Sequence, residues 1–415
     1  MFGLVDGNNF YVSCERAFDP TLIGKPVIVL SNNDGCAIAR SAEAKALGIK
    51  MGEVWHLSKR RPEFRNVVAM SSNYALYGDM SRRVFEVLSE NFTRVEPYSI
   101  DEMFVDLTAF ARADYCRRVR EQVRQITKIP TCIGIGPTKT LAKLANKYAK
   151  TAADLGGVAD FSDNALRRQA FAEMPIDEIW GVGRAAQAKL NALGIFTVQQ
   201  FAALPSASVR KLMTVTGQRT HAELNGLSCM PLSLAPTQRK TVSVTRAFGR
   251  PVEAWEDMRE ALAAHASRAA EKARQHGLEA CAMQVFFHTN PHGDDPWYNA
   301  QRSFEIEPTS DSLALIRHAV GAARSMWRPG LKYAKAGVIL PDLVLASEAP
   351  RDLIPTTDPI KSEKLMTALD GLNARFGRGT IRAGGIRAAP PWAARANNKS
   401  PAYTTRLSDL MEVRA

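Results

Sequence analysis

Two apolar segments that carry acidic residues constrain the fold more than any other feature of the chain. Phe2–Val5 runs directly into Asp6, and the adjacent acids Asp101 and Glu102 stand inside the apolar segment Tyr98–Asp106. Neighbouring side chains on a strand point to opposite faces, so adjacent acids reach one ligand only at a strand end or bend. Burying carboxylates beside apolar residues is costly unless a cation or hydrogen-bond donors compensate them. The pair alone could equally be a solvated turn, and the acid after the first strand favours a shared site.

Size, charge and cysteine usage narrow the class of protein. The chain has 415 residues, more than one hydrophobic core usually supports, so several domains are expected. Its net charge of +12 suggests a polyanionic partner such as nucleic acid, although ribosome-associated and membrane-surface proteins share such an excess. Six scattered cysteines predict reduced thiols, with neither a disulfide frame nor a zinc site. The sequence shows no secretory signal and no apolar run of about 18 residues, so we expect a cytoplasmic protein without membrane contact.

Strands and helices alternate across residues 1–160, which predicts an α/β catalytic region. Strand patterns fall at 2–5, 25–30, 36–39, around 95 and 104, and at 131–136. Helical patterns fall at 9–18, 41–47, 74–89, 109–127 and 138–148. The expected fold class is multidomain, with α/β structure here and α+β structure further along the chain.

Residues 174–232 have short helical patterns, several glycines and no strand pattern. The spacing from Ile176 to Ile195 resembles a helix-hairpin-helix, with Gly181 and Gly183 in the turn and Arg184 opening the second helix. Backbone N–H groups at the start of a helix can bind a DNA phosphate, so these three turn residues are candidate DNA contacts. A plain αα-hairpin with a glycine turn is the alternative.

A linker at 232–237 precedes a second ordered region. A strand at 240–248, a helix at 252–275, a strand pair at 279–306, a helix at 310–326 and a strand at 332–340 follow. This β-α-β-β-α-β order predicts a split βαβ sandwich. Arg239, Lys240 and Arg246 at its first strand suit contact with phosphates, although a basic edge can also simply deter aggregation. Beyond 346 the sequence is rich in Pro, Ala and Arg, with one helix at 361–374.

The acidic residues predict a metal site for phosphoryl transfer. Asp6, Asp101 and Glu102, with the carbonyl of Gly7, could hold two Mg²⁺ ions, because hard oxygen ligands favour this metal. Two such ions clamp the attacking and leaving oxygens of phosphoryl transfer. No G-x-x-x-x-G-K-[ST] loop is present, which disfavours a P-loop NTPase. The sequence also offers no Ser/His/Asp or Cys/His arrangement for acyl transfer.

Four motifs resemble the Y-family of translesion DNA polymerases, and the resemblance runs nearly end to end. They are DGNNFY at 6–11, SNNDGC at 31–36, SSNY at 71–74 and YSIDE at 98–102, and SPAYTTR at 400–406 points to the UmuC type, the catalytic subunit of bacterial DNA polymerase V. The resemblance implies a right-hand architecture. Its parts would be a palm at 1–12 and 69–165 (within a catalytic domain of about 2–185), fingers at 13–68, a helix-hairpin-helix thumb at 166–232, a little finger at 237–345 and a partner-binding tail at 346–415.

The resemblance also assigns roles around the acids. It implies that Asp6, Asp101 and Glu102 are the catalytic, metal-binding carboxylates. Tyr11 matches the aromatic steric gate that lies under the sugar of the incoming nucleotide, with Phe10 packed beside it. Many relatives have a second acid near the first, where this chain has an asparagine that we do not count as a ligand.

The nucleotide contacts are implied less directly. Many relatives carry Tyr and Arg in the helix after the fingers strand, where this chain has Ala42 and Lys45. Arg40, Lys45 and Lys150 are therefore the candidate triphosphate ligands, and a solvated lysine is the alternative for Lys45. Ile38 and Ala39 would cover the templating base, in a loose pocket that gains little discrimination from fit.

The expected function is error-prone translesion synthesis in the SOS response of a bacterium, close to the nucleoid. Primer-template DNA, dNTPs, a UmuD-type processed dimer and the RecA filament are the implied partners, with the basic, poorly patterned tail as the docking segment. Residues 340–345 lack the glutamine and aromatic of a sliding-clamp peptide, which argues against clamp binding there. The alternatives are a catalytically silent DNA-binding scaffold and a nucleotidyl cyclase, whose palm-like domain also pairs carboxylates.

Overall fold

The structure, a computed structural model, describes residues 1–108, 112–234, 238–350 and 358–410. Contacts divide the chain into two units. The first unit comprises Met1–Ser31, Gly35–Pro236 and Asn398–Ala415, and the second comprises Asn32–Asp34 and Thr237–Asn397. Within the described ranges, no helix is both long enough and apolar enough to cross a membrane.

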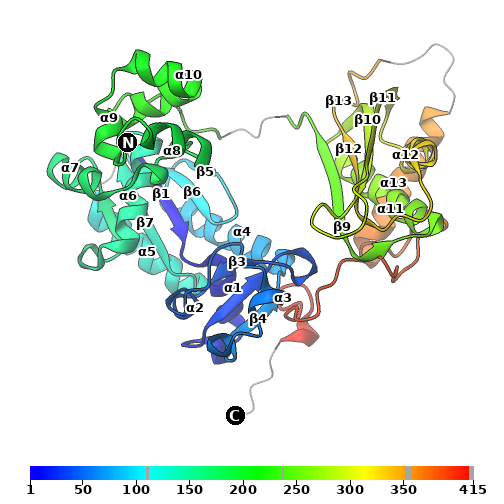
Figure 1. The fold of residues 1–415 in the computed structure, drawn as a ribbon, viewed down its shortest axis with the longest axis horizontal. Helices are drawn as coiled ribbons and strands as arrows, with labels where there is room; N and C mark the ends of the chain where they lie inside the picture. Colours follow the sequence, from blue (N-terminus) through cyan, green and yellow to red (C-terminus); the bar gives the residue numbers. More distant parts are fainter. Residues whose placement is uncertain (109–111, 235–237, 351–357, 411–415) are drawn as a thin grey trace. The chain divides into compact units, whose positions relative to one another are not determined.

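A five-stranded sheet forms the centre of the first unit. Its order is β5 (Val95–Pro97), β6 (Glu102–Asp106), β1 (Phe2–Gly7), β7 (Thr131–Gly136) and β8 (Val158–Asp160). The first strand of the chain therefore lies in the middle, antiparallel to both neighbours (Figure 1). These strands confirm the strand patterns predicted for residues 2–5, 95, 104 and 131–136.

Helices cover both faces of this sheet. They are α4 (Tyr74–Asn91), α5 (Arg112–Thr127) and α6 (Lys139–Thr151). Val5 and Val105 point towards a core that they share with α4 and α5, whereas Leu4 and Phe104 point to the opposite face, towards α6. The first three residues of the helix predicted at 109–127 lie outside the described residues.

Helix α6 lies against the backbone of β7. A Cβ atom added to Gly134 would come within 2.0 Å of the backbone nitrogen of Asn146 and 2.1 Å of the carbonyl oxygen of Ala142. Only glycine permits such an approach. The Asn146 side chain donates hydrogen bonds to the carbonyls of Leu4, at 3.2 Å, and Cys132, at 2.7 Å, which fixes α6 to β1 and β7.

A three-stranded sheet of order β3-β2-β4, in which β2 and β4 are parallel, takes two strands from the predicted fingers and a third, β4, from the predicted boundary with the palm. The elements are β2 (Val27–Leu30), β3 (Ala37–Arg40), β4 (Val68–Ser71), α1 (Phe10–Phe18), α2 (Ala42–Ala46) and α3 (Trp55–Ser58). The strands at 25–30 and 36–39 were predicted, and β4 was not.

Residues 174–232 are helical without a strand, as predicted. Helices α8 (Arg184–Asn191), α9 (Val198–Ala202) and α10 (Ser206–Leu224) lie in this part of the chain, and α7 (Asn164–Glu173) directly precedes it. Gly181 has a φ of 92°, a conformation that favours glycine, and Gly183 is the N-cap of α8. The glycine turn that the spacing predicted is therefore present.

The second unit contains the predicted β-α-β-β-α-β succession. Its elements are β9 (Val242–Val252), α11 (Trp255–Arg274), β10 (Leu278–Thr289), β11 (Asn299–Thr309), α12 (Ser312–Met326) and β12 (Tyr333–Leu340). The sheet is antiparallel in the order β11-β10-β12-β9, so β12 lies between the two strands that α11 connects. This arrangement confirms the split βαβ topology and puts β9 at an edge.

Most described residues of the tail are exposed, and the tail is held at a few points. The helix predicted at 361–374 is present as α13 (Pro359–Phe376), which an ion pair of 2.7 Å between Arg274 and Asp370 joins to α11. Strand β13 (Leu343–Leu345), just before the tail, pairs with β10. Trp392 is only 7% exposed and donates its indole N–H to Glu260. Residues 235–237 of the predicted linker and 351–357 and 411–415 of the tail lie outside the described residues.

Candidate active site

The predicted acids meet at adjoining ends of β1 and β6. Asp6 is paired directly with Glu102 in the antiparallel ladder, an arrangement that brings opposite Cβ atoms to about 5 Å. Asp101 precedes β6, and its carbonyl accepts a hydrogen bond of 2.8 Å from the backbone of Gly7. Because Asp101 stands just outside the strand, it avoids the alternation that would separate it from Glu102.

Two lysines of α6 pair with these acids. Strand alternation puts Asp6 and Glu102 on the α6 face of the sheet. Lys150 Nζ lies 2.7 Å from Asp6 Oδ2, and Lys143 Nζ lies 2.6 Å from both carboxylate oxygens of Glu102. The two lysines are seven residues apart, two helical turns, and therefore project from the same side of α6. Lys150 was predicted from the sequence as a triphosphate ligand, whereas Lys143 was not among the predicted site residues. The only sequence signal for Lys143 was the row of lysines along this helix.

Asp6 is a buried acid with two other carboxylates nearby. Burial raises the pKa of Asp6 to about 6 against the opposing effect of Lys150, and the nearby carboxylates of Glu102 and Asp101 add to the rise. In the described part of the chain, no three His, Cys, Asp or Glu side chains form a ready-made metal centre. The donors are nevertheless the hard oxygens that Mg²⁺ prefers, and this ion commonly completes its shell with water and substrate phosphates. The ligand set fits the metal in chemistry and stays a prediction.

The predicted steric gate lies beside the acids. Asn9 adopts the left-handed conformation, with a φ of 47°, and turns the chain from β1 into α1. Phe10 is buried, and the half-buried Tyr11 ring stacks on Tyr77 with centroids 4.4 Å apart and planes 14° apart. Burial raises the pKa of the Tyr11 hydroxyl, and Asp101 is among the charges that add to this rise. Tyr11 therefore lies close enough to Asp101 for the charge of that acid to act on its hydroxyl.

The triphosphate candidates differ in their surroundings. Lys45 donates a hydrogen bond of 2.6 Å to the side chain of Asn9, and burial lowers its pKa, as do Arg40 and Lys150. Both Lys45 and Lys150 therefore lie near the acids. Arg40 instead donates to the carbonyl of Ile49, at 2.7 Å, so its guanidinium is already engaged within the fingers.

The two residues predicted to cover the templating base differ in exposure. Ala39 is 8% exposed and belongs to the hydrophobic core, whereas Ile38 is partly buried and packs against the same core. Their opposite orientations follow from their adjacent positions on β3. Of the pair, only Ile38 presents its side chain at the surface of this sheet.

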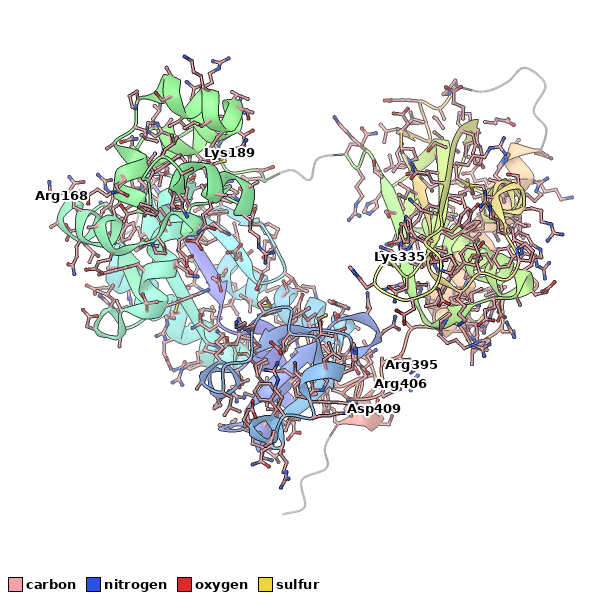
Figure 2. The ribbon with its side chains drawn as sticks, in the orientation of Figure 1. Arg168, Lys189, Lys335, Arg395, Arg406 and Asp409 are labelled. Carbon is pink, nitrogen blue, oxygen red and sulfur yellow. The ribbon has the colours of Figure 1, made fainter. Side chains whose placement is uncertain are left out.

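The predicted DNA contacts of the thumb are exposed. Gly181, Gly183 and Arg184 all lie at the surface, where α8 begins. Figure 2 shows two further basic side chains, Arg168 on α7 and Lys189 on α8, projecting from the same group of helices.

Arg246 belongs to a larger cationic cluster in the second unit. Arg239, Lys240 and Arg246 are exposed at the edge strand β9 or just before it. Arg246 also lines a pocket of about 550 Å³ whose other basic side chains are Arg268, Lys272 and Arg378. Burial lowers the pKa of Lys272, and the neighbouring arginines lower it further. The sequence analysis missed these three residues, because they come from α11 and the tail, which approach β9 only in the folded chain.

Family models match most of the chain. The impB/mucB/samB family matches residues 5–147, its C-terminal domain matches residues 239–353, and the helix-hairpin-helix motif of the same family matches residues 168–195. A domain of unknown function matches residues 363–413, within the tail.

Similar proteins extend over the whole length. Protein UmuC of Salmonella typhimurium is 42% identical and covers 100% of both chains. DNA polymerase IV 1 of Bacillus subtilis is 27% identical and covers 92% of this chain and 91% of its own. Among solved structures, a Y-family DNA polymerase chimera of Dbh and Dpo4 matches with a TM-score of 0.67 over 83% of this chain and 100% of its own, at 19% identity, which supports the fold.

Proposed function

The chain belongs to the UmuC group of Y-family DNA polymerases, and from this we propose that it is an error-prone translesion enzyme. It would add dNTPs to a primer opposite damaged template bases during SOS mutagenesis. The observation that carries this proposal is the pairing of Asp6 with Glu102 on neighbouring strands, with Asp101 and Tyr11 beside them.

In the proposed reaction the primer 3′-hydroxyl attacks the α-phosphate of the dNTP, and pyrophosphate leaves. Asp6, Asp101 and Glu102, with the carbonyl of Gly7, are the proposed ligands of two Mg²⁺ ions. Such ions, when bound, stabilise the charge that develops on the attacking and leaving oxygens. Lys150 lies 2.7 Å from Asp6 and would offer its ammonium group to the triphosphate.

Tyr11 is the proposed sugar filter. Its ring is held against Tyr77 by stacking and cannot easily move aside. A ribose 2′-hydroxyl would therefore clash with the ring, and the ribonucleotide would be excluded. The template base would meet Ile38 in the fingers, where an aliphatic side chain offers no hydrogen bond that could reject a damaged base.

DNA would be bound through its backbone. The proposed contacts are the helix start at Gly181, Gly183 and Arg184, and the basic residues Arg239, Lys240 and Arg246 at β9. Contacts of this kind fix the register of a duplex without reading its sequence, as a polymerase requires. A UmuD-type processed dimer and the RecA filament are the proposed protein partners, by analogy with the family.

Primer extension with Mg²⁺ tests the carboxylates. Replacing Asp101→Ala together with Glu102→Ala should lower dNTP incorporation by about a thousandfold or more, because the ligands that stabilise transition-state charge are lost. Glu90→Ala is the control, since it removes an exposed acid from α4. The presence of all three acids argues against the alternative of a catalytically silent scaffold. Extension at the wild-type rate by the double variant would contradict the proposed role of these acids.

Two choices of template complete the test. Extension across an abasic site, with and without the candidate protein partners, measures the translesion activity itself. Omitting the template strand separates a polymerase from a nucleotidyl cyclase, because only the polymerase depends on it. Failure to pass the lesion under every condition would contradict the translesion part of the proposal while leaving the polymerase assignment in place.

A further inference from the structure

The end of the tail returns to the first unit and joins the edge of β4. The backbone N–H of Ser71 donates to the carbonyl of Asn398, at 2.9 Å, and the N–H of Asn398 donates to the Ser71 hydroxyl, at 3.0 Å. A few residues later the ring of Tyr403 stacks on Phe18 of α1, with centroids 5.0 Å apart and planes 5° apart. The segment 398–403 (the docked segment) is therefore anchored at both of its ends.

Ser400 is the buried centre of the docked segment. It is 8% exposed, and the side chain of Asn73, itself 2% exposed, donates to the Ser400 hydroxyl at 2.9 Å. The same amide reaches the carbonyls of Ser400 and Pro401, at 3.4 and 3.3 Å. Asn73 immediately precedes α4, so the docked segment is joined to the start of the helix that carries Tyr77.

The Ser400 hydroxyl in turn donates to Glu15. This carboxylate is 1% exposed, and its Oε1 accepts hydrogen bonds from Ser400, at 3.2 Å, and from the Tyr77 hydroxyl, at 2.6 Å. Burying such a group is costly unless donors satisfy it. Its Oε2 has no hydrogen-bond partner among the described residues, so the two hydroxyls on Oε1 are the donors that offset this cost. Glu15 also lies one helical turn after Tyr11 in α1 and thus links both helices that flank the gate.

We propose that Ser400, Glu15 and Tyr77 are positioning residues for Tyr11, and that the docked segment thereby sets how strictly the enzyme excludes ribonucleotides. The Tyr77 ring, fully buried, is the surface on which Tyr11 stacks. Its hydroxyl is held by Glu15, and Glu15 is held by the tail. A steric gate discriminates only if its ring stays within about half an ångström of the right position, so loosening its support weakens the gate.

The inference rests on the proposed role of Tyr11 and gives a function to part of residues 363–413, which match a domain of unknown function. The docked segment acts on the choice of sugar and not on the acids, because its contacts lead to Tyr77 and Tyr11. The specificity for dNTPs would therefore depend on Ser400, a residue of the tail that lies 385 positions after its partner Glu15 in the sequence.

The test measures single-nucleotide insertion by the full-length chain, with dNTP and rNTP in parallel. Ser400→Ala and Tyr77→Phe each remove one hydroxyl from the network, and each should raise the ratio of rNTP to dNTP kcat/KM by about two- to tenfold, the range that corresponds to one hydrogen bond. Ser400→Thr retains the hydroxyl and should keep the wild-type ratio. Ser408→Ala is the matched control, because Ser408 is an exposed serine of the same tail.

Tyr11→Ala separates this inference from the proposal on which it rests. If Tyr11→Ala raises the ratio while Ser400→Ala and Tyr77→Phe leave it unchanged, the gate stands and the role of the docked segment is wrong. If Tyr11→Ala itself leaves the ratio unchanged, the gate is wrong, whatever the tail variants do. A fall in dNTP insertion with a constant ratio would indicate a purely structural role and would also overturn the inference.

Discussion

At the scale of single residues, the site gives up stability for chemistry. Asp6 is buried between a lysine and two further acids, and burial raises its pKa to about 6 from 3.8. A carboxyl whose pKa is raised by folding stabilises the fold below its unfolded pKa, and this contribution is lost as the pH rises through the folded value. At neutral pH the ionised Asp6 therefore costs stability, as is common for groups tuned for function.

Asp6→Asn should consequently stabilise the metal-free protein at alkaline pH while abolishing polymerisation. The gain in unfolding free energy should be about 3 kcal/mol near pH 8 and should close towards pH 4, because each unit of pKa shift corresponds to about 1.4 kcal/mol. Denaturant unfolding in the presence of a chelator measures it. A gain that is independent of pH would show that the charge of Asp6 is not its cause.

At the scale of elements, the position of α6 decides where two lysines meet two acids. The helix can lie flat on β7 because Gly134 has no side chain. Both lysine contacts depend on the short distance between α6 and the sheet, because Lys143 and Lys150 extend from the helix to acids on the strands. The packing of one glycine is thus part of the electrostatics of the site.

Gly134→Ala should therefore destabilise the first unit and impair catalysis together. Its Cβ would meet the backbone of α6 at about 2 Å, which flexible side chains cannot relieve, so a loss of more than 3 kcal/mol is expected. Thermal unfolding and primer extension measure the two effects. Gly78→Ala on α4 is the control, because its Cβ meets nothing within 4 Å and should add about 0.5–1 kcal/mol. An unaltered melting temperature for Gly134→Ala would contradict the packing argument.

At the scale of the whole molecule, the charge of +12 is the property most directly related to DNA. Part of it gathers in the second unit, where Arg246, Arg268 and Lys272 line one pocket beside the edge strand. The side chain of His265 is buried in the same place, and its Nε2 has no hydrogen-bond partner in the described residues. Cations concentrated in this way suit phosphate binding more than general solubility.

The salt dependence of DNA binding tests this cluster. Arg246→Ala and Lys272→Ala should each weaken primer-template binding and lower the slope of log K against log salt by about one, because one phosphate contact is lost. Arg317→Ala removes an equal charge from an exposed site on α12 and should leave the slope nearly unchanged. An equal loss of slope in all three variants would indicate that net charge matters and the cluster does not. Fluorescence anisotropy at several salt concentrations provides the measurement.

Local patterns along the chain were sufficient for most of the elements and for the acids. The apolar run that ends in Asp6 and the apolar residues that flank Asp101 and Glu102 predicted strands with a shared site, and the β-α-β-β-α-β succession predicted the second sheet. These features are encoded by residues close together in sequence, through strand alternation and helical periodicity. The motifs around them were specific enough to indicate the polymerase family, and they single out Tyr11 as the proposed gate residue.

Contacts between distant residues were decided only by the tertiary structure. Lys143 contacts Glu102, Arg378 lies near Arg268, and Ser400 contacts Glu15. Each of these pairs forms because whole elements pack against one another. No local pattern specifies such pairs, since each side chain by itself is compatible with a solvated surface position. The tail is the clearest case. Its composition suggests a loose segment, whereas in the structure a few of its residues, such as Ser400 and Trp392, are buried against other parts of the chain. Burial depends on the partner surface as much as on the segment, and that surface exists only after folding.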